Sequence, residues 1–283
     1  MRYVIALGGN AIDKATMRAA AKAITGLYAK GNEIVITHGN GPQVGELAAV
    51  EKKSLSLLTA QTEAEIGLMI EGCLHTEETK VATLITRVLV DPHDAAFGMP
   101  SKPIGMALSR KEATKLMMDG LVVRKTAVGL RRVVASPIPN DVLESGFISS
   151  LLKDGYIVIA GGGGGVPIFY RNGRVHYADA VIDKDLTSAL MARKVKADRL
   201  IILTTVDGAY TGFKTKRQRM IGRATIGQLV KMLKGGEFEE GSMKPKIKAC
   251  MNFVKATGNV AAIGSMSKPS NAISLRRATV ITR

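Results

Sequence analysis

The 283-residue chain is long enough for one large domain or two lobes, and its 46% hydrophobic and 23% charged residues are ordinary for a globular protein. This composition excludes disorder, and no apolar run reaches the roughly 18 residues that a membrane span needs. The 40 basic and 24 acidic residues leave a net charge of +16, but the basic residues are spread along the chain and aromatic residues make up only 4%. A base-stacking nucleic-acid surface is therefore disfavoured, and small anionic substrates fit the charge as well as a solvated surface does.

The first apolar run, Tyr3–Leu7, is too short for a signal segment, so a cytoplasmic protein with no membrane partner is expected. Cys73 and Cys250 stand alone, without the spacing of a metal site, and the four histidines are equally scattered. No protein-held metal is predicted.

In chain order, short β-branched apolar runs alternate with glycine-rich turns and helical patterns. The runs predicted as strands are nearly continuous in hydrophobicity, as in strands buried on both faces, and they are Tyr3–Leu7, Glu33–Thr37, Val81–Thr86, Arg132–Ala135, Tyr156–Ala160, Leu200–Thr205, Val260–Ile263 and Thr279–Thr282. The predicted helices are Ala15–Ala29, Gln61–His75, Asp141–Lys153, Asp185–Lys194, Ile226–Leu233 and Met243–Ala256. This alternation predicts βαβ units in a mostly parallel sheet with helices on both faces.

The stretch from about Asp91 to Leu130 interrupts this rhythm. It contains three prolines and a group of basic residues, which are Arg110, Lys111, Lys115, Arg124 and Lys125. We expect an insertion or lid that packs on the main sheet without belonging to it. The basic group is more often a solvated face than a functional one.

Three glycine-rich turns directly follow predicted strands. They are Gly8-Gly9-Asn10, the segment from His38 to Gly45 that contains Asn40 and Gly41, and the run Gly161–Gly165. In parallel sheets ligands bind beyond the carboxyl ends of the strands, where glycine turns expose N–H groups and the next helices add positive ends. One such turn is usually only a tight turn, but three together indicate a phosphate or carboxylate site.

Two familiar nucleotide motifs are missing. No segment fits the P-loop pattern GxxxxGK[ST]. A GxGxxG match inside five consecutive glycines has little meaning, and no suitable acidic residue closes a βαβ unit after it, which argues against a dinucleotide site.

Two predicted helix starts carry charges suited to phosphoryl transfer. The segment Val181–Asp185 opens one helix and Gly241–Lys246 opens the other. Phosphoryl transfer needs positioned cations around the moving group and a residue that holds them in place. Lys184 and Lys246 are candidates for the cations and Asp185 for the organiser, although on spacing alone helix capping or solvent exposure is equally probable.

A further loop follows the strand Leu200–Thr205. It contains Val206, Asp207, Tyr210 and Phe213 and leads into the basic run Lys214–Arg219. An aromatic side chain beside basic residues can hold adenine and face a triphosphate. A solvated loop explains the basic run equally well.

Together these segments resemble the amino acid kinase family, and within it the carbamate kinases, over nearly the whole chain. The matching segments are Ala6–Ala11, Thr37–Gly45, Lys102–Gly105, Arg131–Val134 with Ser136-Pro137, the glycine run, Val181–Asp185, Val206–Gly208 and Gly241–Lys246. The HGNGPQVG and VIDKD segments are the specific ones. An isopentenyl phosphate kinase would be expected to carry HGxGSFGH at the second turn, which this chain does not.

The resemblance implies a three-layer αβα sandwich with a mostly parallel open sheet. It implies one amino acid kinase domain over residues 1–283, with a small protruding, lid-like subdomain at about 91–130. The implied reaction is reversible phosphoryl transfer between ADP or ATP and carbamate, running from carbamoyl phosphate toward ATP. Mg²⁺ with ATP or ADP, a homodimer, a cytoplasmic location and a role in arginine metabolism are implied with it.

The same resemblance assigns roles to individual residues. The carbamate and the transferring phosphoryl group are assigned to Gly8, Gly9, Asn10, Asn40 and Gly41. Lys184 and Lys246 would stabilise charge on the phosphoryl group, and Asp185 would orient both lysines. The nucleotide is assigned to Gly162, Gly163, Val206, Asp207, Tyr210, Phe213, Met243 and Lys246.

The chain departs from the family pattern at several places. Thr205 stands where Asp is usual, and Lys244 stands where Gly is usual. The segment Val122–Arg132 is short and lacks a clean match to the lysine that relatives extend into the site, with Arg124 or Lys125 as the suggested replacement. These departures concern nucleotide geometry and lid closure more than the reaction class.

Two alternatives stay open beside the carbamate kinase hypothesis. One is another acyl phosphate-forming kinase of the same family, with a small acid such as N-acetylglutamate as its substrate. The other is a non-catalytic relative that binds nucleic acid, which the charge of +16 favours. A degenerate kinase would be expected to lose Lys184, Asp185 or Lys246 first, and all three are present.

Overall fold

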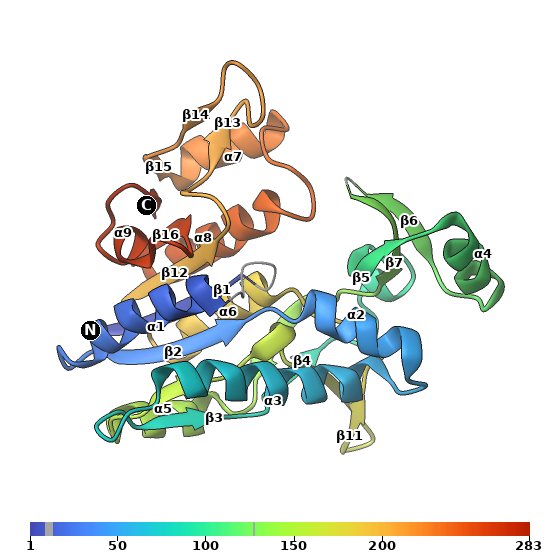
Figure 1. The fold of residues 1–283 in the computed structure, drawn as a ribbon, viewed down its shortest axis with the longest axis horizontal. Helices are drawn as coiled ribbons and strands as arrows, with labels where there is room; N and C mark the ends of the chain where they lie inside the picture. Colours follow the sequence, from blue (N-terminus) through green and yellow to red (C-terminus); the bar gives the residue numbers. More distant parts are fainter. Residues whose placement is uncertain (9–13, 127) are drawn as a thin grey trace.

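The computed structural model describes residues 1–8, 14–126 and 128–283 (Figure 1). Within these residues the central element is an eight-stranded sheet in the order β15-β17-β16-β12-β1-β2-β9-β3. Its strands are β1 (Arg2–Leu7), β2 (Glu33–His38), β3 (Val81–Thr83), β9 (Ile157–Ile159), β12 (Arg199–Thr204), β15 (Arg223–Thr225), β16 (Val260–Ser265) and β17 (Thr279–Thr282). Neighbouring strands are parallel except for β16 and β17, which pair antiparallel.

Strand β1 lies inside the sheet between β12 and β2, and its Ile5 is paired with Ile201 and Ile36. Alternate residues of β1 point to opposite faces, so Ile5 belongs to one hydrophobic core and Val4 to another. All of these side chains are fully buried. A nearly continuous apolar strand therefore fits here because both faces of the sheet are covered.

Helices cover the two faces of the sheet. One layer contains α1 (Lys14–Tyr28), α3 (Leu55–Leu74) and α9 (Pro269–Ile273), and the other contains α5 (Ser145–Lys153), α6 (Lys184–Lys194), α7 (Ile226–Lys234) and α8 (Met243–Thr257). This arrangement confirms the expected three-layer αβα sandwich with a mostly parallel sheet. Within the described residues, no helix is long and apolar enough to span a bilayer.

A second sheet lies beside the main one, in the order β11-β10-β4-β8. Its strands are β4 (Arg87–Val90), β8 (Pro139–Val142), β10 (Val166–Arg171) and β11 (Arg174–Tyr177). A separate hairpin pairs β13 (Tyr210–Thr211) with β14 (Arg219–Met220). Two short 3₁₀ helices, η2 (Ala95–Phe97) and η3 (Gly162–Gly164), complete the connections.

A third sheet, β5-β7-β6, stands away from the main body together with α4, on the right of Figure 1. Its elements are β5 (Lys102–Leu108), α4 (Arg110–Met118), β6 (Val123–Thr126) and β7 (Gly129–Val134). It adjoins α2 (Gly41–Val50), where a Cβ on Gly45 would lie 1.9 Å from the Gly105 nitrogen. Only two glycines allow the backbones of α2 and β5 to approach this closely.

Several predicted elements need correction. The run Arg132–Ala135 was predicted among the strands of the main sheet, but it belongs to β7 in the third sheet, because hydrophobicity alone does not say which sheet a strand joins. The helix predicted from Asp141 begins at Ser145, because Asp141 lies in strand β8, where it pairs with Leu89 of β4. Helix α3 begins six residues before the predicted Gln61, with Ser54 as its N-cap. Helix α2 was not predicted.

Candidate active site

The predicted glycine turns meet at one edge of the main sheet. Strands β1, β2 and β9 are neighbours, so the turns after them lie side by side. The N–H of Gly39 donates to the Leu7 carbonyl at 3.1 Å, and the N–H of Gly8 donates to the Leu203 carbonyl at 3.0 Å. Gly9 and Asn10, which were also assigned to the substrate, lie outside the described residues.

The second turn leads directly into helix α2. Asn40 is the N-cap residue but makes no side-chain cap, because its Nδ2 donates to Thr62 Oγ1 at 2.8 Å and the side chain is buried. The N–H groups in the first turn of a helix have no partner within that helix, and they favour anions. Gly41 therefore starts a helix whose free N–H groups belong to the same sheet edge as Gly8.

The third turn is shaped by close packing as well as by flexibility. Gly161, Gly163, Gly164 and Gly165 all have positive φ. A Cβ on Gly163 would lie 2.1 Å from Asn40 Nδ2, so the second and third turns press against each other. The glycines are thus required by the fold itself, in addition to any anion they bind.

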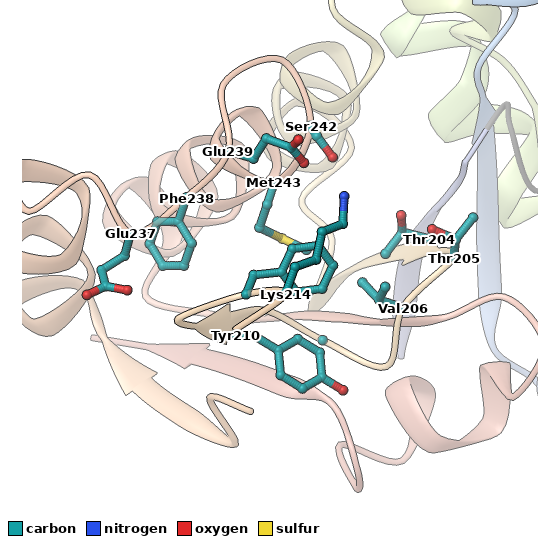
Figure 2. A pocket seen from close by; sticks show the side chains of 12 residues that line it. Thr204, Thr205, Val206, Tyr210, Lys214, Glu237, Phe238, Glu239, Ser242 and Met243 are labelled. Carbon is teal, nitrogen blue, oxygen red and sulfur yellow. The ribbon is translucent and has the colours of Figure 1, made fainter. Parts of the chain in front are cut away.

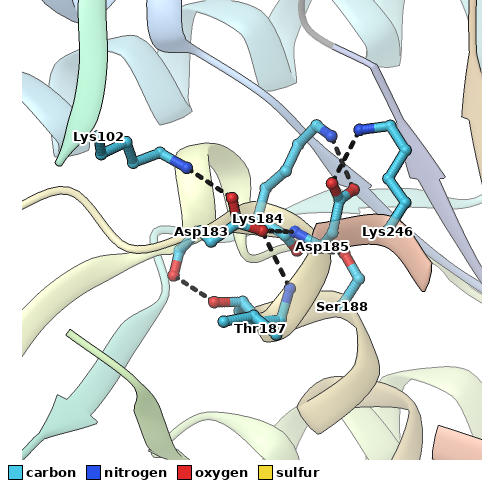
Figure 3. Close-up of polar contacts among 9 residues, drawn as sticks. Lys102, Asp183, Lys184, Asp185, Thr187, Ser188 and Lys246 are labelled. Atoms are coloured by element: carbon cyan, nitrogen blue, oxygen red, sulfur yellow. Dashed lines mark hydrogen bonds and ion pairs between the residues drawn. The ribbon is translucent and has the colours of Figure 1, made fainter. Parts of the chain in front are cut away.

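Two lysines from different helices meet on one buried carboxylate (Figure 3). Lys184 Nζ donates to Asp185 Oδ1 at 2.8 Å, and Lys246 Nζ donates to Asp185 Oδ2 at 2.9 Å. The Asp185 side chain is 3% exposed, and both lysine side chains are mostly covered. The structure therefore brings together the three residues predicted as catalytic.

Burial and charge oppose each other in this cluster. Burial would raise the pKa of Asp185, but the attraction of Lys184 and Lys246 outweighs it and holds that pKa well below its usual range. Burial lowers the pKa of Lys184, whereas for Lys246 the attraction of Asp185 outweighs burial and raises the pKa. Two ammonium groups share one carboxylate, so the cluster offers net positive charge to an anion.

The start of α6 is held by Asp183. Its Oδ1 accepts from the N–H of Asp185 at 2.9 Å and of Leu186 at 3.3 Å, which caps the helix that presents Lys184. Its Oδ2 accepts from Lys102 Nζ at 2.7 Å. Burial would raise the pKa of Asp183, but the charge of Lys102 outweighs that effect and lowers it.

Lys102 was not among the predicted site residues, although it lies in one of the segments that carried the resemblance. It belongs to β5, so its ion pair with Asp183 ties the third sheet to the helix of Lys184 and Asp185. Arg124 and Lys125, the suggested replacements for a lid lysine, are exposed on β6. The position of Lys102 between Pro100 and Pro103, in a segment that carried the resemblance, was the available signal.

A cavity of about 270 Å³ opens beyond the end of β12 (Figure 2). Four predicted nucleotide residues line it, namely Val206, Tyr210, Phe213 and Met243. Asp207 and the glycine run are not among its lining residues, and Lys246 belongs to the lysine–aspartate cluster instead. The cavity also contains residues that were not predicted, which are Thr204, Thr205, Gly208, Lys214, Glu237, Phe238, Glu239 and Ser242.

The cavity combines an aromatic wall with charged groups. The rings of Tyr210 and Phe213 are 5.9 Å apart, and Lys214 Nζ lies 5.3 Å from the Phe213 ring centre. Met243 begins α8, and Lys246 follows it within one turn of the same helix. A flat apolar ring bound in the cavity would therefore lie one helical turn from the lysine–aspartate cluster.

Comparison with known proteins finds similarity over nearly the whole chain. The model of the amino acid kinase family matches residues 1–265. The carbamate kinase of Thermoplasma acidophilum is 41% identical over 303 aligned positions, covering 100% of this chain and 99% of that protein. Two solved structures of Giardia lamblia carbamate kinase, bound to citric acid and to AMP-PNP, are each 34% identical in sequence. The match covers 99% of this chain and 98% of each solved chain, with TM-scores of 0.89 and 0.87.

Proposed function

This chain belongs to the amino acid kinase family, and from that premise we propose that it is a carbamate kinase, transferring a phosphoryl group between ADP or ATP and carbamate. The observation that carries the proposal is Asp185 held between Lys184 and Lys246 at the edge where the glycine turns meet. Full-length similarity to carbamate kinases supports the acceptor.

In the proposed reaction an oxygen of the ADP β-phosphate attacks the phosphorus of carbamoyl phosphate. The bond between that phosphorus and the carbamoyl oxygen breaks, and carbamate leaves. Such a transfer needs positioning and electrostatic stabilisation more than acid–base chemistry. Lys184 and Lys246 would stabilise charge on the moving group, with Asp185 fixing both ammonium groups.

The acceptor side of the site would lie at the first two glycine turns, after β1 and β2. Gly9, Asn10 and Gly41 would hold carbamate and the phosphoryl group through backbone N–H groups or short side chains. Gly8 would line the same site without donating, because its N–H is bonded to the Leu203 carbonyl. The buried Asn40 side chain would contribute by fixing the second turn in place, because it packs on Gly163 and donates a hydrogen bond to Thr62. Lys102 would add a cation from the third sheet.

The nucleotide would enter as its Mg²⁺ complex, with its base in the cavity beside Tyr210 and Phe213. Glycines 162 and 163, Val206, Asp207, Met243 and Lys246 would complete its binding. Among the described residues, no group of three or more His, Cys, Asp or Glu side chains is arranged to hold a metal. Magnesium commonly keeps its waters and binds substrate phosphates, which suits such a site.

Helix α3 supports a homodimer as part of this proposal. Its outward face carries exposed Leu57, Leu68 and Met69, with Ala64 and Gly72 between and beside them. The same face also carries exposed Gln61 and Glu65, but several large exposed apolar side chains on one helix are typical of a surface that contacts a partner. We expect Leu68→Glu to give a monomer in sedimentation, with turnover retained, and a variant that stays dimeric would exclude α3 as the interface.

A cytoplasmic location and a role in arginine breakdown are further parts of the proposal, in line with the family resemblance. The reaction itself is tested by ATP formation from ADP, Mg²⁺ and carbamoyl phosphate, with Asp185→Ala as the control. Synthesis by the wild type that is lost in the control supports both reaction and site. A folded protein that makes no ATP would contradict the proposal, and phosphorylation of N-acetylglutamate in its place would favour the other acyl acceptor.

A further inference from the structure

Behind the third glycine turn, helix α3 buries an acidic side chain. Glu63 is 1% exposed. Its Oε1 accepts from the N–H of Gly162 at 2.8 Å, and its Oε2 accepts from the N–H of Thr86 at 3.2 Å. Within the described part of the chain it forms no ion pair. A carboxyl group this deeply buried is costly to the fold, so the groups it holds deserve a functional explanation.

Thr86 completes the contact from the same side. Its Oγ1 accepts from the N–H of Gly161 at 2.8 Å, and its carbonyl accepts from the N–H of Val166 at 2.8 Å. The Thr86 side chain is fully buried. Glu63 and Thr86 therefore fix the first two peptides of the glycine turn and the residue that follows the turn.

The remaining N–H groups of the turn divide into two kinds. Those of Gly164 and Gly165 donate to the carbonyls of Gly161 and Gly162, at 3.1 and 2.9 Å. The N–H of Gly163 has no acceptor among the described residues. The contacts from behind thus leave one backbone donor of the turn available to an anion.

Gly162 has no room to move within this arrangement. A Cβ on it would lie 2.4 Å from His38 Nε2 and 2.8 Å from Glu63 Cγ. His38 is fully buried, burial lowers its pKa to about 4, and its Nε2 has no partner in the described structure. The His38 imidazole is therefore neutral and packs against Gly162, and the peptide of Gly162 is held by the hydrogen bond that its N–H donates to Glu63 Oε1.

We propose that Glu63 is a positioning residue that, with Thr86, fixes the glycine turn so that the Gly163 N–H faces the nucleotide phosphates. The inference rests on the proposed kinase function and adds a residue to it. Glu63 itself touches no substrate. It acts through the peptide of Gly162, from the opposite side of the turn.

Three substitutions test this role. Glu63→Gln keeps the shape and one acceptor oxygen, but its NH₂ group cannot accept from Thr86. Thr86→Val removes the hydroxyl that accepts from Gly161. The matched control is Glu71→Gln, two turns further along α3, where the carboxylate accepts from the Thr83 hydroxyl and contacts no part of the turn.

We expect both E63Q and T86V to raise the KM for ADP about tenfold with a smaller change in kcat, as for loss of one buried hydrogen bond. E71Q is expected to stay within about twofold of the wild type. The KM for carbamoyl phosphate should change less than that for ADP in all three. Circular dichroism and thermal unfolding establish that each variant is folded.

A pH profile separates positioning from a purely structural role. Burial raises the pKa of Glu63 to about 8, against the opposing hydrogen bonds from Thr86 and Gly162 and with a contribution from the nearby Glu144 charge. An ionised carboxylate behind the turn would repel nucleotide phosphates, so the wild-type KM for ADP should rise as pH passes about 8. E63Q should lack that rise, and E71Q should retain it.

Folded E63Q and T86V with unchanged KM for ADP, or an E63Q pH profile identical to that of the wild type, would overturn the inference. If E63Q does not fold, T86V and the wild-type profile decide it. Failure of the kinase proposal is distinguishable, because the wild type would then make no ATP. The dissociation constants of ADP, measured by calorimetry for the same proteins, would still show whether Glu63 positions the turn.

Discussion

Two of the buried carboxyl groups in the described part of the chain, Asp185 and Glu63, lie near the same sheet edge but have pKa values shifted in opposite directions. Asp185 lies between two lysines, and its pKa falls well below the usual range. Glu63 receives backbone N–H groups but no cation from the described residues, and its pKa rises to about 8. Burial disfavours the charge in both cases, so the difference comes from the neighbouring lysines. A carboxylate that organises cations must stay ionised, whereas one that holds a peptide can function as a neutral acid.

The largest effect is expected from breaking the charged cluster. Lys246→Ala removes one of the two cations and leaves Asp185 paired with Lys184 alone. We expect kcat to fall by at least about 10³-fold, because stabilisation of the transferred charge is the main catalytic contribution in phosphoryl transfer. Steady-state ATP synthesis measures it. Retention of full activity by a folded variant would reject Lys246 as a catalytic residue.

The raised pKa of Glu63 predicts that the protein loses stability as the pH becomes alkaline. The folded-state pKa of Glu63 is raised from 4.5 to about 8. The contribution of Glu63 to the free energy of unfolding is therefore fully present below pH 4.5 and is lost as pH rises toward 8. Asp185, whose pKa is lowered, contributes fully at any pH above its unfolded value near 3.8. His38 changes stability only below about pH 6.5, because its pKa is lowered.

Between pH 6.5 and 8 neither Asp185 nor His38 changes the free energy of unfolding, and comparison with E63Q removes any contribution of Lys184, whose pKa is lowered by burial. We expect the free energy of unfolding of the wild type to fall by about 2 kcal/mol more than that of E63Q over this interval. Urea unfolding at the two pH values measures the difference. Parallel changes in both proteins would mean that Glu63 titrates outside the interval.

A smaller effect is expected at the ion pair that joins the third sheet to the cluster. Lys102→Met keeps the aliphatic stem but leaves the buried Asp183 oxygen without its cation. We expect the KM for carbamoyl phosphate to rise about tenfold, because helix α6 keeps its cap while the third sheet loses its ion pair with that helix. Lys125→Met, exposed on β6, is the matched control. Equal kinetics in both variants would remove Lys102 from the site.

Much of the fold could be predicted from the sequence because its strands are buried on both faces. Tyr3–Leu7 and Leu200–Thr205 have no other plausible structure, and the glycine turns after such strands indicated the edge where the cluster is found. Arg132–Ala135 looked the same in hydrophobicity but joined another sheet. The sheet a strand joins depends on its distant partners, which an apolar pattern does not name.

The candidate site was predictable where residues act locally and unpredictable where they act across the fold. Lys184 and Asp185 sit together at a helix start, so their role was visible in the motif. Glu63 looks like one of several polar residues in a helix, and its burial follows from a glycine turn 99 positions further along the chain. Glu237 and Glu239 reach the cavity from a loop that carries no recognisable pattern.

The close backbone contact between Gly45 and Gly105 has a mechanical consequence. Side chains in contact can adjust to small displacements by changing rotamers. Two backbones in direct contact, as at Gly45 and Gly105, cannot adjust in this way. A rotation of β5 is therefore transmitted to α2, whose first turn contributes N–H groups to the anion-binding edge. The protruding sheet and the start of α2 would therefore move together, so that a displacement of the third sheet also displaces the N–H groups at the anion-binding edge.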